Sequence, residues 1–139
     1  MRIIKFRGWD SDNKVMTDVE TIEFIDGVKV SWCGKYFINE RGRKDCYSGY
    51  NNLMQFTGLH DKNGKEIYEG DIVKDNKDEA IGLVIYTPPT FSVKLIDKLD
   101  TDDYWALGAG KVYPDNYKLS DTEVIGNIYQ NPELSEGKQ

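Results

Sequence analysis

The residues from Gly58 to Val73, GLHDKNGKEIYEGDIV, constrain the fold of this chain more than any other segment. Gly70 permits a backbone conformation with positive φ just before a strand, and Asp71 can accept hydrogen bonds from nearby backbone amides. Asn63-Gly64 marks another tight turn. The β-branched pair that follows Asp71 favours a sheet. The segment therefore predicts a turn followed by the first strand of a small, mostly β barrel.

Short apolar runs separated by turn residues fill the rest of the chain, and no window keeps a helical period for long. Asp26-Gly27 lies between the β-forming runs 21–25 and 28–32, which is the strongest local signal for a hairpin. Glycines punctuate residues 33–52 and predict a long loop there, with a short strand at 35–38. Many short strands with little helix favour a barrel or a sandwich.

The pattern predicts a single, mainly β domain with little helix in a chain of 139 residues. An N-terminal lobe of β-hairpins covers about residues 1–57, and a small barrel covers about 58–131. The polar residues 132–139 follow the last strand, and we expect them to fray. Neither lobe carries many large apolar residues, so we expect folding to require both. The residues assigned to the structural motif are Gly58, Asn63, Gly64, Gly70, Asp71 and Gly126.

The net charge of −6 is unevenly distributed along the chain. Residues 1–57 carry nine lysines and arginines against eight acidic residues, whereas residues 58–139 carry nine against sixteen. An acidic protein repels phosphate backbones at long range, so the overall charge disfavours generic nucleic-acid binding. We expect any anionic ligand to meet the first part of the chain rather than the second.

Cysteine and histidine are too few for the common metal sites. Cys33 and Cys46 are the only cysteines, and their spacing matches no zinc pattern, so we expect reduced thiols in or near a core. His60 is the only histidine, which excludes paired-histidine sites and favours a solvated loop residue. The sequence therefore predicts no metal, no cofactor and no catalytic residue.

Membrane and secretion signals are not found in the sequence. No apolar run reaches the roughly 18 residues of a transmembrane helix. The first ten residues, MRIIKFRGWD, lack the apolar region of a signal peptide. We therefore expect a cytoplasmic protein with no membrane partner.

Three segments stand out as a set: KFRGWD at 5–10, LMQFTGL with DKNGKEIYEGDIV within 53–73, and EVIGNIYQNPEL at 123–134. Together they resemble the YopX family of phage and prophage proteins over residues 2–134, with the regions between them matched least. The resemblance implies a mainly β fold with an SH3-like barrel, a phage or prophage gene and a host-cytoplasm setting. It carries over no catalytic residue.

The segment from Trp32 to Tyr50 mixes cations with aromatic rings. Proteins that bind single-stranded nucleic acid combine cations for the phosphates with aromatic faces for the bases. Tyrosines are also common anchors of protein interfaces. Three interpretations follow: a protein or self-association surface, a nucleic-acid site in the loop 35–50, and plain loop packing. The candidate interaction residues are Tyr36, Phe37, Arg41, Arg43, Lys44, Tyr47 and Tyr50.

The acidic loop 97–103 suggests a further alternative. Its aspartates are of the kind that hold magnesium for phosphoryl chemistry, as in a metal-dependent hydrolase. Such a site needs rigid elements to converge the carboxylates, and this run reads as a solvated loop. The aspartates of the loop are Asp97, Asp100, Asp102 and Asp103.

The leading hypothesis is a non-enzymatic protein-interaction or self-assembling module. Sheets of short strands leave edges that can pair with other chains, and tyrosine-rich segments supply anchors. The expected partners are a second copy of the chain, in a homo-oligomer, and a host or phage protein. The second hypothesis is a nucleic-acid-binding accessory protein, and the third is the hydrolase.

Overall fold

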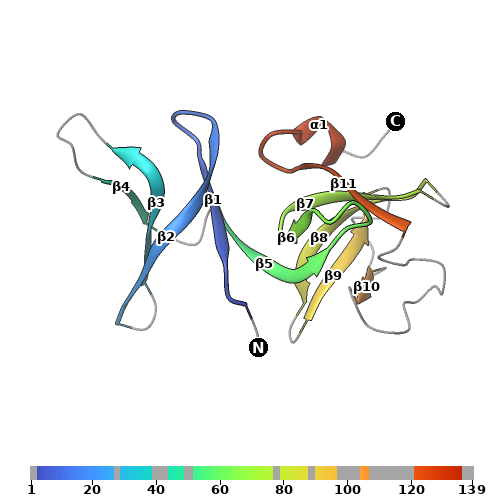
Figure 1. The fold of residues 1–139 in the computed structure, drawn as a ribbon, viewed down its shortest axis with the longest axis horizontal. Helices are drawn as coiled ribbons and strands as arrows, with labels where there is room; N and C mark the ends of the chain where they lie inside the picture. The colour runs from blue at the N-terminus through green and yellow to red at the C-terminus, as the bar shows by residue number, and fades with distance from the viewer. Residues whose placement is uncertain are drawn as a thin grey trace. The chain divides into compact units, whose positions relative to one another are not determined.

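The computed structural model describes residues 3–26, 29–38, 44–48, 52–76, 79–87, 90–96, 104–106 and 121–135. The chain is mainly β, as the sequence predicts, with two antiparallel sheets and one short helix in the described part (Figure 1). It divides into two compact units, Met1–Gln55 and Phe56–Gln139.

The first unit is an antiparallel sheet with the strand order β4-β3-β2-β1-β5. The strand β5 contributes its first residues here, through the pair Phe6 and Gln55. The hairpin predicted at Asp26-Gly27 is confirmed, because Ile25 pairs with Lys29 and Asp26 has a φ of +53°. The strands are β1 (Phe6–Asp10), β2 (Val15–Ile25), β3 (Lys29–Ile38), β4 (Lys44–Ser48) and β5 (Leu53–His60).

A buried carboxylate shapes the turn between β1 and β2. One oxygen of Asp10 accepts hydrogen bonds from the amides of Asp12 and Asn13, at 3.0 and 3.1 Å. Its other oxygen accepts from the side-chain amide of Asn13 at 2.8 Å. Asp10 is fully buried, and its bonds replace the water that a carboxylate otherwise requires.

Trp32 is the largest fully buried side chain in the first unit. Its ring lies against the backbone of Gly8, so close that a Cβ placed on Gly8 would be 2.3 Å from Cη2 of the ring. Met54 is also buried, and its sulfur accepts a hydrogen bond from Arg7 at 3.6 Å. A glycine in β1 therefore makes room for the core of this unit.

The second unit contains a five-stranded antiparallel sheet with the order β10-β9-β8-β7-β11, together with β6 paired to the end of β5. Within the described residues the pairing gives an open order rather than a closed ring, so the SH3-like closure stays a prediction. The elements are β6 (Glu66–Tyr68), β7 (Asp71–Asp75), β8 (Ile81–Thr87), β9 (Thr90–Leu95), β10 (Tyr104–Ala106), β11 (Thr122–Asn127) and α1 (Pro132–Ser135).

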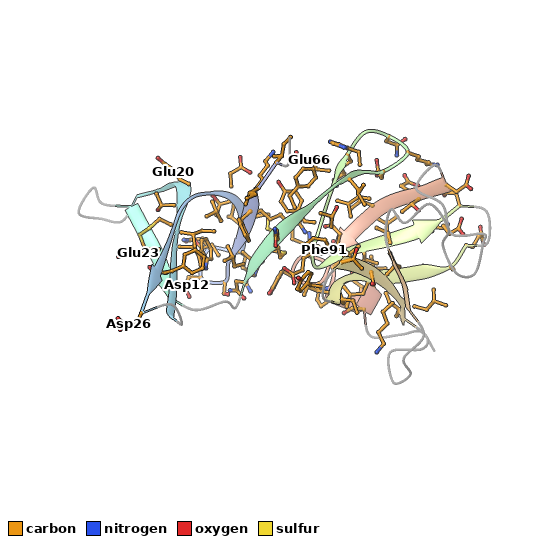
Figure 2. The ribbon with its side chains drawn as sticks, turned by 90° about the horizontal axis from the view of Figure 1, so that it is seen from below. Asp12, Glu20, Glu23, Asp26, Glu66 and Phe91 are labelled. Carbon is orange, nitrogen blue, oxygen red and sulfur yellow. A yellow bond between two sulfur atoms is a disulfide. The ribbon has the colours of Figure 1, made fainter. Side chains whose placement is uncertain are left out.

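Four fully buried aliphatic side chains form the core of the second unit, and partly buried side chains pack around them. Phe91, labelled in Figure 2, is one of the surrounding side chains and lies 5.2 Å, between ring centroids, from Tyr86. The core takes one residue from each of the strands β6, β7, β8 and β9. The four core residues are Ile67, Val73, Val84 and Val93.

The chain after β11 differs from the frayed tail that we expect from the sequence. Residues 132–135 form the short helix α1 (Figure 1). The side chain of Asn127 accepts hydrogen bonds from the amides of Tyr129 and Gln130, at 3.0 and 2.9 Å, and so turns the chain back. This asparagine-based turn gives the helical turn a fixed starting point.

Candidate interaction edge

Residues 29–38 and 44–48 form two paired strands, within the segment 33–52 that the sequence predicts as a long loop. The strand β3 continues to Ile38, and β4 pairs with it antiparallel. The loop prediction is wrong because Gly34 lies inside β3, buried and opposite Val19 of β2. A glycine at such a position reflects close packing of the strands rather than a turn.

The backbone of four candidate interaction residues lies on this hairpin. Tyr36 and Phe37 are in β3, and Lys44 and Tyr47 are in β4. Their role as an interaction surface stays a prediction. The remaining candidates lie outside the described residues, and they are Arg41, Arg43 and Tyr50.

A disulfide joins Cys33 of β3 to Cys46 of β4, which contradicts the expectation of reduced thiols in or near a core. The two cysteines are directly opposite in the register, with their Cα atoms 4.1 Å apart. Cys46 is exposed and Cys33 is half-buried. The thirteen-residue separation fits no zinc pattern, but it does fit two strands of one hairpin, and the sequence analysis missed this.

The short Cα separation also shows which positions of β4 are hydrogen-bonded to β3 and which are not. Directly opposite residues alternate between hydrogen-bonded pairs, about 5.5 Å apart, and non-hydrogen-bonded pairs, about 4.5 Å apart. The 4.1 Å between Cys33 and Cys46 places them in a non-hydrogen-bonded pair. Ser31 and Ser48 are two residues further along and share this phase. The peptide N–H of Ser48 is therefore directed away from β3, toward the outer side of β4.

Four strands end the two sheets: β4, β6, β10 and β11. The strands β6 and β10 have three residues each. The turn at 61–65 covers β11, because the amide of Lys62 donates to the carbonyl of Thr122 at 2.9 Å. Within the described part of the chain, β4 is thus the longest terminal strand without such a covering turn, and it has five residues.

Acidic side chains line the neighbouring strand β2. Glu20 and Glu23 lie along β2, and Asp26 follows at its end (Figure 2). All three are exposed. The strand that pairs with β3 therefore carries exposed acidic side chains.

The structural-motif residues hold the second unit together through backbone geometry. Gly58, Gly64 and Gly70 all have positive φ, between +82° and +86°. The amide of Gly70 donates to the carbonyl of Val84 at 2.9 Å, and its carbonyl accepts from the amide of Ile128 at 3.0 Å. Gly70 thereby connects three strand regions at a conformation that favours glycine.

The carboxylate of Asp71 accepts a hydrogen bond from the amide of Tyr68 at 2.8 Å. Asp71 is buried and opens β7. Its position fits a turn-forming aspartate, and the bond is local to the turn.

Gly126 pairs with Ile72 of β7, directly after a register shift in β11 that follows Val124. A Cβ at Gly126 would come within 2.5 Å of the side-chain oxygen of Asn131. That oxygen accepts a hydrogen bond from the amide of Asn127 at 3.2 Å. Gly126 therefore gives Asn131 room to fasten the turn after β11.

Asp61 is the main structural residue that the sequence analysis missed. One of its oxygens accepts from the amides of Asn63 and Lys65, at 2.8 and 2.9 Å. The other accepts from the amide of Val124 in β11, at 3.0 Å. A carboxylate ahead of Asn63-Gly64 indicates the local turn, but no sequence signal indicates the distant bond.

The pKa of Asp61 is lower than the ordinary value of 3.8. Burial by itself would raise this pKa, because it penalises the charged form. The amides of Val124, Lys65 and Asn63, helped by the charge of Lys65, favour the carboxylate and outweigh burial. Asp61 is therefore charged when the protein is folded at neutral pH.

His60 is the last residue of β5 and is exposed, with its ring 5.7 Å from that of Phe56. Among the described residues, no three His, Cys, Asp or Glu side chains form a group that could hold a metal ion. The acidic loop 97–103 lies outside the described residues. The hydrolase hypothesis therefore stays a prediction.

No helix in the described part of the chain is long and apolar enough to span a membrane.

Comparison with known proteins identifies a family and similar solved structures. The sequence profile of the family described as "YopX protein" matches residues 5–136. The crystal structure of protein EF1440 from Enterococcus faecalis is similar, with 29% identity and a TM-score of 0.63. The match covers 98% of this chain and 100% of that chain. Comparison with curated proteins gave no match.

Proposed function

This chain belongs to the YopX family, and we propose that it is a phage- or prophage-encoded, non-enzymatic interaction module that assembles through the edge strand β4. The partner at that edge is a second copy of the chain, which adds its own β4 as the next strand. The setting is the cytoplasm of the host cell. The observation that supports the proposal is the outward direction of the Ser48 N–H on β4, which among the described residues is the longest terminal strand without a covering turn.

Strand addition fits the chemistry of such an edge. Main-chain hydrogen bonds between two strand edges supply affinity without a specialised pocket. Two identical strands that pair antiparallel form a closed, two-fold symmetric contact. A homodimer is therefore the simplest assembly that uses β4.

The charge distribution supports a second copy as the partner. The chain carries −6 in total, but residues 1–57 carry nine positive and eight negative side chains. Like charges oppose self-association when they lie close together. The strand β4 belongs to this nearly neutral part of the chain, so the strands that pair do not come from the acidic residues 58–139.

Light scattering over a range of protein concentrations tests the proposal. We expect the measured mass to rise above 16.0 kDa with concentration. Ser48→Pro removes the outward N–H and leaves the bonds to β3 in place, so it should shift the mass back to 16.0 kDa. Ser48→Ala keeps the N–H and is the matched control. A wild-type mass of 16.0 kDa at every concentration would contradict self-assembly.

A host or phage protein can compete for the same edge. Affinity capture of the tagged chain from induced cells, compared between wild type and Ser48→Pro, separates the two cases. A protein captured by the wild type but lost with Ser48→Pro, while the wild type stays at 16.0 kDa in isolation, would replace the second copy as the partner.

Nucleic-acid binding is the second candidate function. The observation in its favour is that β3 and β4 are joined by a segment of sequence that carries Arg41 and Arg43, with Lys44 opening β4. Such binding would weaken steeply with salt. Mobility-shift assays with single-stranded DNA and RNA at low salt, using Arg41→Ala with Arg43→Ala as the comparison, test it. The absence of any shift at low salt would remove this candidate.

A further inference from the structure

We propose that the Cys33–Cys46 disulfide is a thiol–disulfide exchange site through which low-molecular-weight thiols loosen the edge strand β4. The chemistry concerns the two sulfurs alone. Its consequence for assembly rests on the proposed function, because β4 is the strand through which copies pair.

The position of the bond makes it accessible. Cys46 lies on a terminal strand and its side chain is exposed, whereas Cys33 is half-buried in β3. Exchange needs a thiolate that can reach one sulfur directly. The structure therefore favours attack on Sγ of Cys46 over attack on Sγ of Cys33.

The reaction balances with two equivalents of a thiol such as reduced glutathione. The thiolate of the first glutathione attacks Sγ of Cys46, forms a mixed disulfide there and expels the thiolate of Cys33, which takes up a proton. A second glutathione attacks the sulfur of the bound glutathione and releases Cys46 as a thiolate. The protein disulfide is reduced by two electrons, and two glutathiones leave joined as their own disulfide.

The bond matters to β4 because it links the strand covalently to β3, beside the backbone pairing. Its register with β3 covers three consecutive pairs, Ser31–Ser48, Trp32–Tyr47 and Cys33–Cys46, before an irregularity. In the sheet order of the described residues, β4 is a terminal strand whose neighbour is β3. Breaking the covalent link therefore leaves β4 free to separate from β3 more often.

The proposed location in the host cytoplasm would expose the disulfide to reducing thiols. Disulfides in a reducing cytoplasm are usually transient and serve catalysis or redox sensing. With two cysteines in the whole chain, intramolecular oxidation has a single product. The chain can therefore alternate between one oxidised and one reduced form.

The experiment uses the full chain, first oxidised with oxidised glutathione and then exposed to reduced glutathione at millimolar concentration. Alkylation followed by mass spectrometry counts free thiols and locates any mixed disulfide. We expect full conversion to two free thiols, with the transient glutathione adduct on Cys46. Persistence of the disulfide, or failure of the oxidised form to appear, would overturn the proposal.

Hydrogen exchange then measures the effect on β4. On reduction we expect exchange of the Tyr47 amide, which lies in the hydrogen-bonded pair with Trp32, to accelerate by at least about tenfold, while that of β7 stays unchanged. The double variant Cys33→Ser with Cys46→Ser should match the reduced protein and not respond to glutathione. Unchanged exchange in β4 on reduction would also overturn the proposal.

Light scattering of both forms separates this inference from the proposed function. If reduction loosens β4 but both forms measure 16.0 kDa, the exchange site stands and assembly through β4 fails. If the oxidised protein assembles and glutathione leaves the bond intact, assembly stands and the exchange site fails. If both stand, the reduced form should assemble less at equal concentration.

Discussion

The carboxylate of Asp61 accepts a hydrogen bond of 3.0 Å from the backbone amide of Val124, 63 residues later in the chain. The same side chain organises its own turn through Asn63 and Lys65. One buried group thus ties the turn before β6 to the last strand, β11.

Asp61→Asn should lower the free energy of unfolding by about 1–3 kcal/mol. The amide keeps one accepting oxygen and turns a donor toward backbone N–H groups, so at least one buried N–H loses its partner. Urea denaturation followed by circular dichroism measures the loss. Asp12→Asn, at an exposed aspartate, is the control and should change stability by no more than about 0.5 kcal/mol. Equal stability of the two variants would contradict a structural role for Asp61.

The contribution of Asp61 should depend on pH in a defined direction. Its pKa in the folded protein is lower than the ordinary 3.8, so the folded state favours the charged form. The resulting stability is fully present above about pH 4 to 5 and is lost as pH falls through the folded pKa. The difference in unfolding free energy between wild type and Asp61→Asn should therefore shrink in acid. A difference that grows below the ordinary pKa would reverse this assignment.

Gly8→Ala should destabilise the first unit by about 1–3 kcal/mol or more, because overpacking forces neighbours to move. The added Cβ would be 2.3 Å from two atoms of the fully buried Trp32 ring. Tryptophan fluorescence during urea unfolding follows the change. The combined variant with Trp32→Phe, which shortens the ring, should lose less than the sum of the single variants. Thr21→Ala, at an exposed site in β2, is the control. If the losses in unfolding free energy of the two single variants simply add in the combined variant, the added Cβ does not press on the Trp32 ring.

Gly64 provides a test of backbone conformation separate from packing. Its φ is +82°, and a Cβ there would meet nothing within 4 Å. Gly64→Ala should therefore cost about 1–2 kcal/mol through conformation alone. Gly64→Asn should cost less, because asparagine tolerates this region. Thermal melts of the two variants make the comparison, and a larger loss for asparagine would show that space, not φ, limits the site.

The β character and the main turns follow from local chemistry that is visible in the sequence. Asp26-Gly27 predicts its hairpin because few residues adopt positive φ, and Ile25 does pair with Lys29. Gly70 and Asp71 likewise fit a turn that leads into β7. These features depend on residues a few positions apart, so a single sequence is enough to indicate them.

The features that escaped prediction depend on register and on distant pairing. Gly34 resembles a turn residue in sequence, yet it lies opposite Val19 inside a sheet. Cys33 and Cys46 bond because β3 and β4 bring them face to face. The amide partner of Asp61 in β11 is equally distant. Spacing alone does not specify which strands are neighbours, so these contacts could not be inferred.

The disulfide and the outward N–H of Ser48 both follow from the register of β4 against β3. Both require Cys46, and Ser48 two residues after it, to occupy non-hydrogen-bonded positions opposite β3. A single-residue slip of β4 against β3 would separate the sulfurs and, at the same time, turn that N–H inward. The disulfide and the outward N–H therefore depend on the same register. A natural variant whose register shifts by one inserted residue would be expected to lose both features, and a second insertion would be expected to restore both.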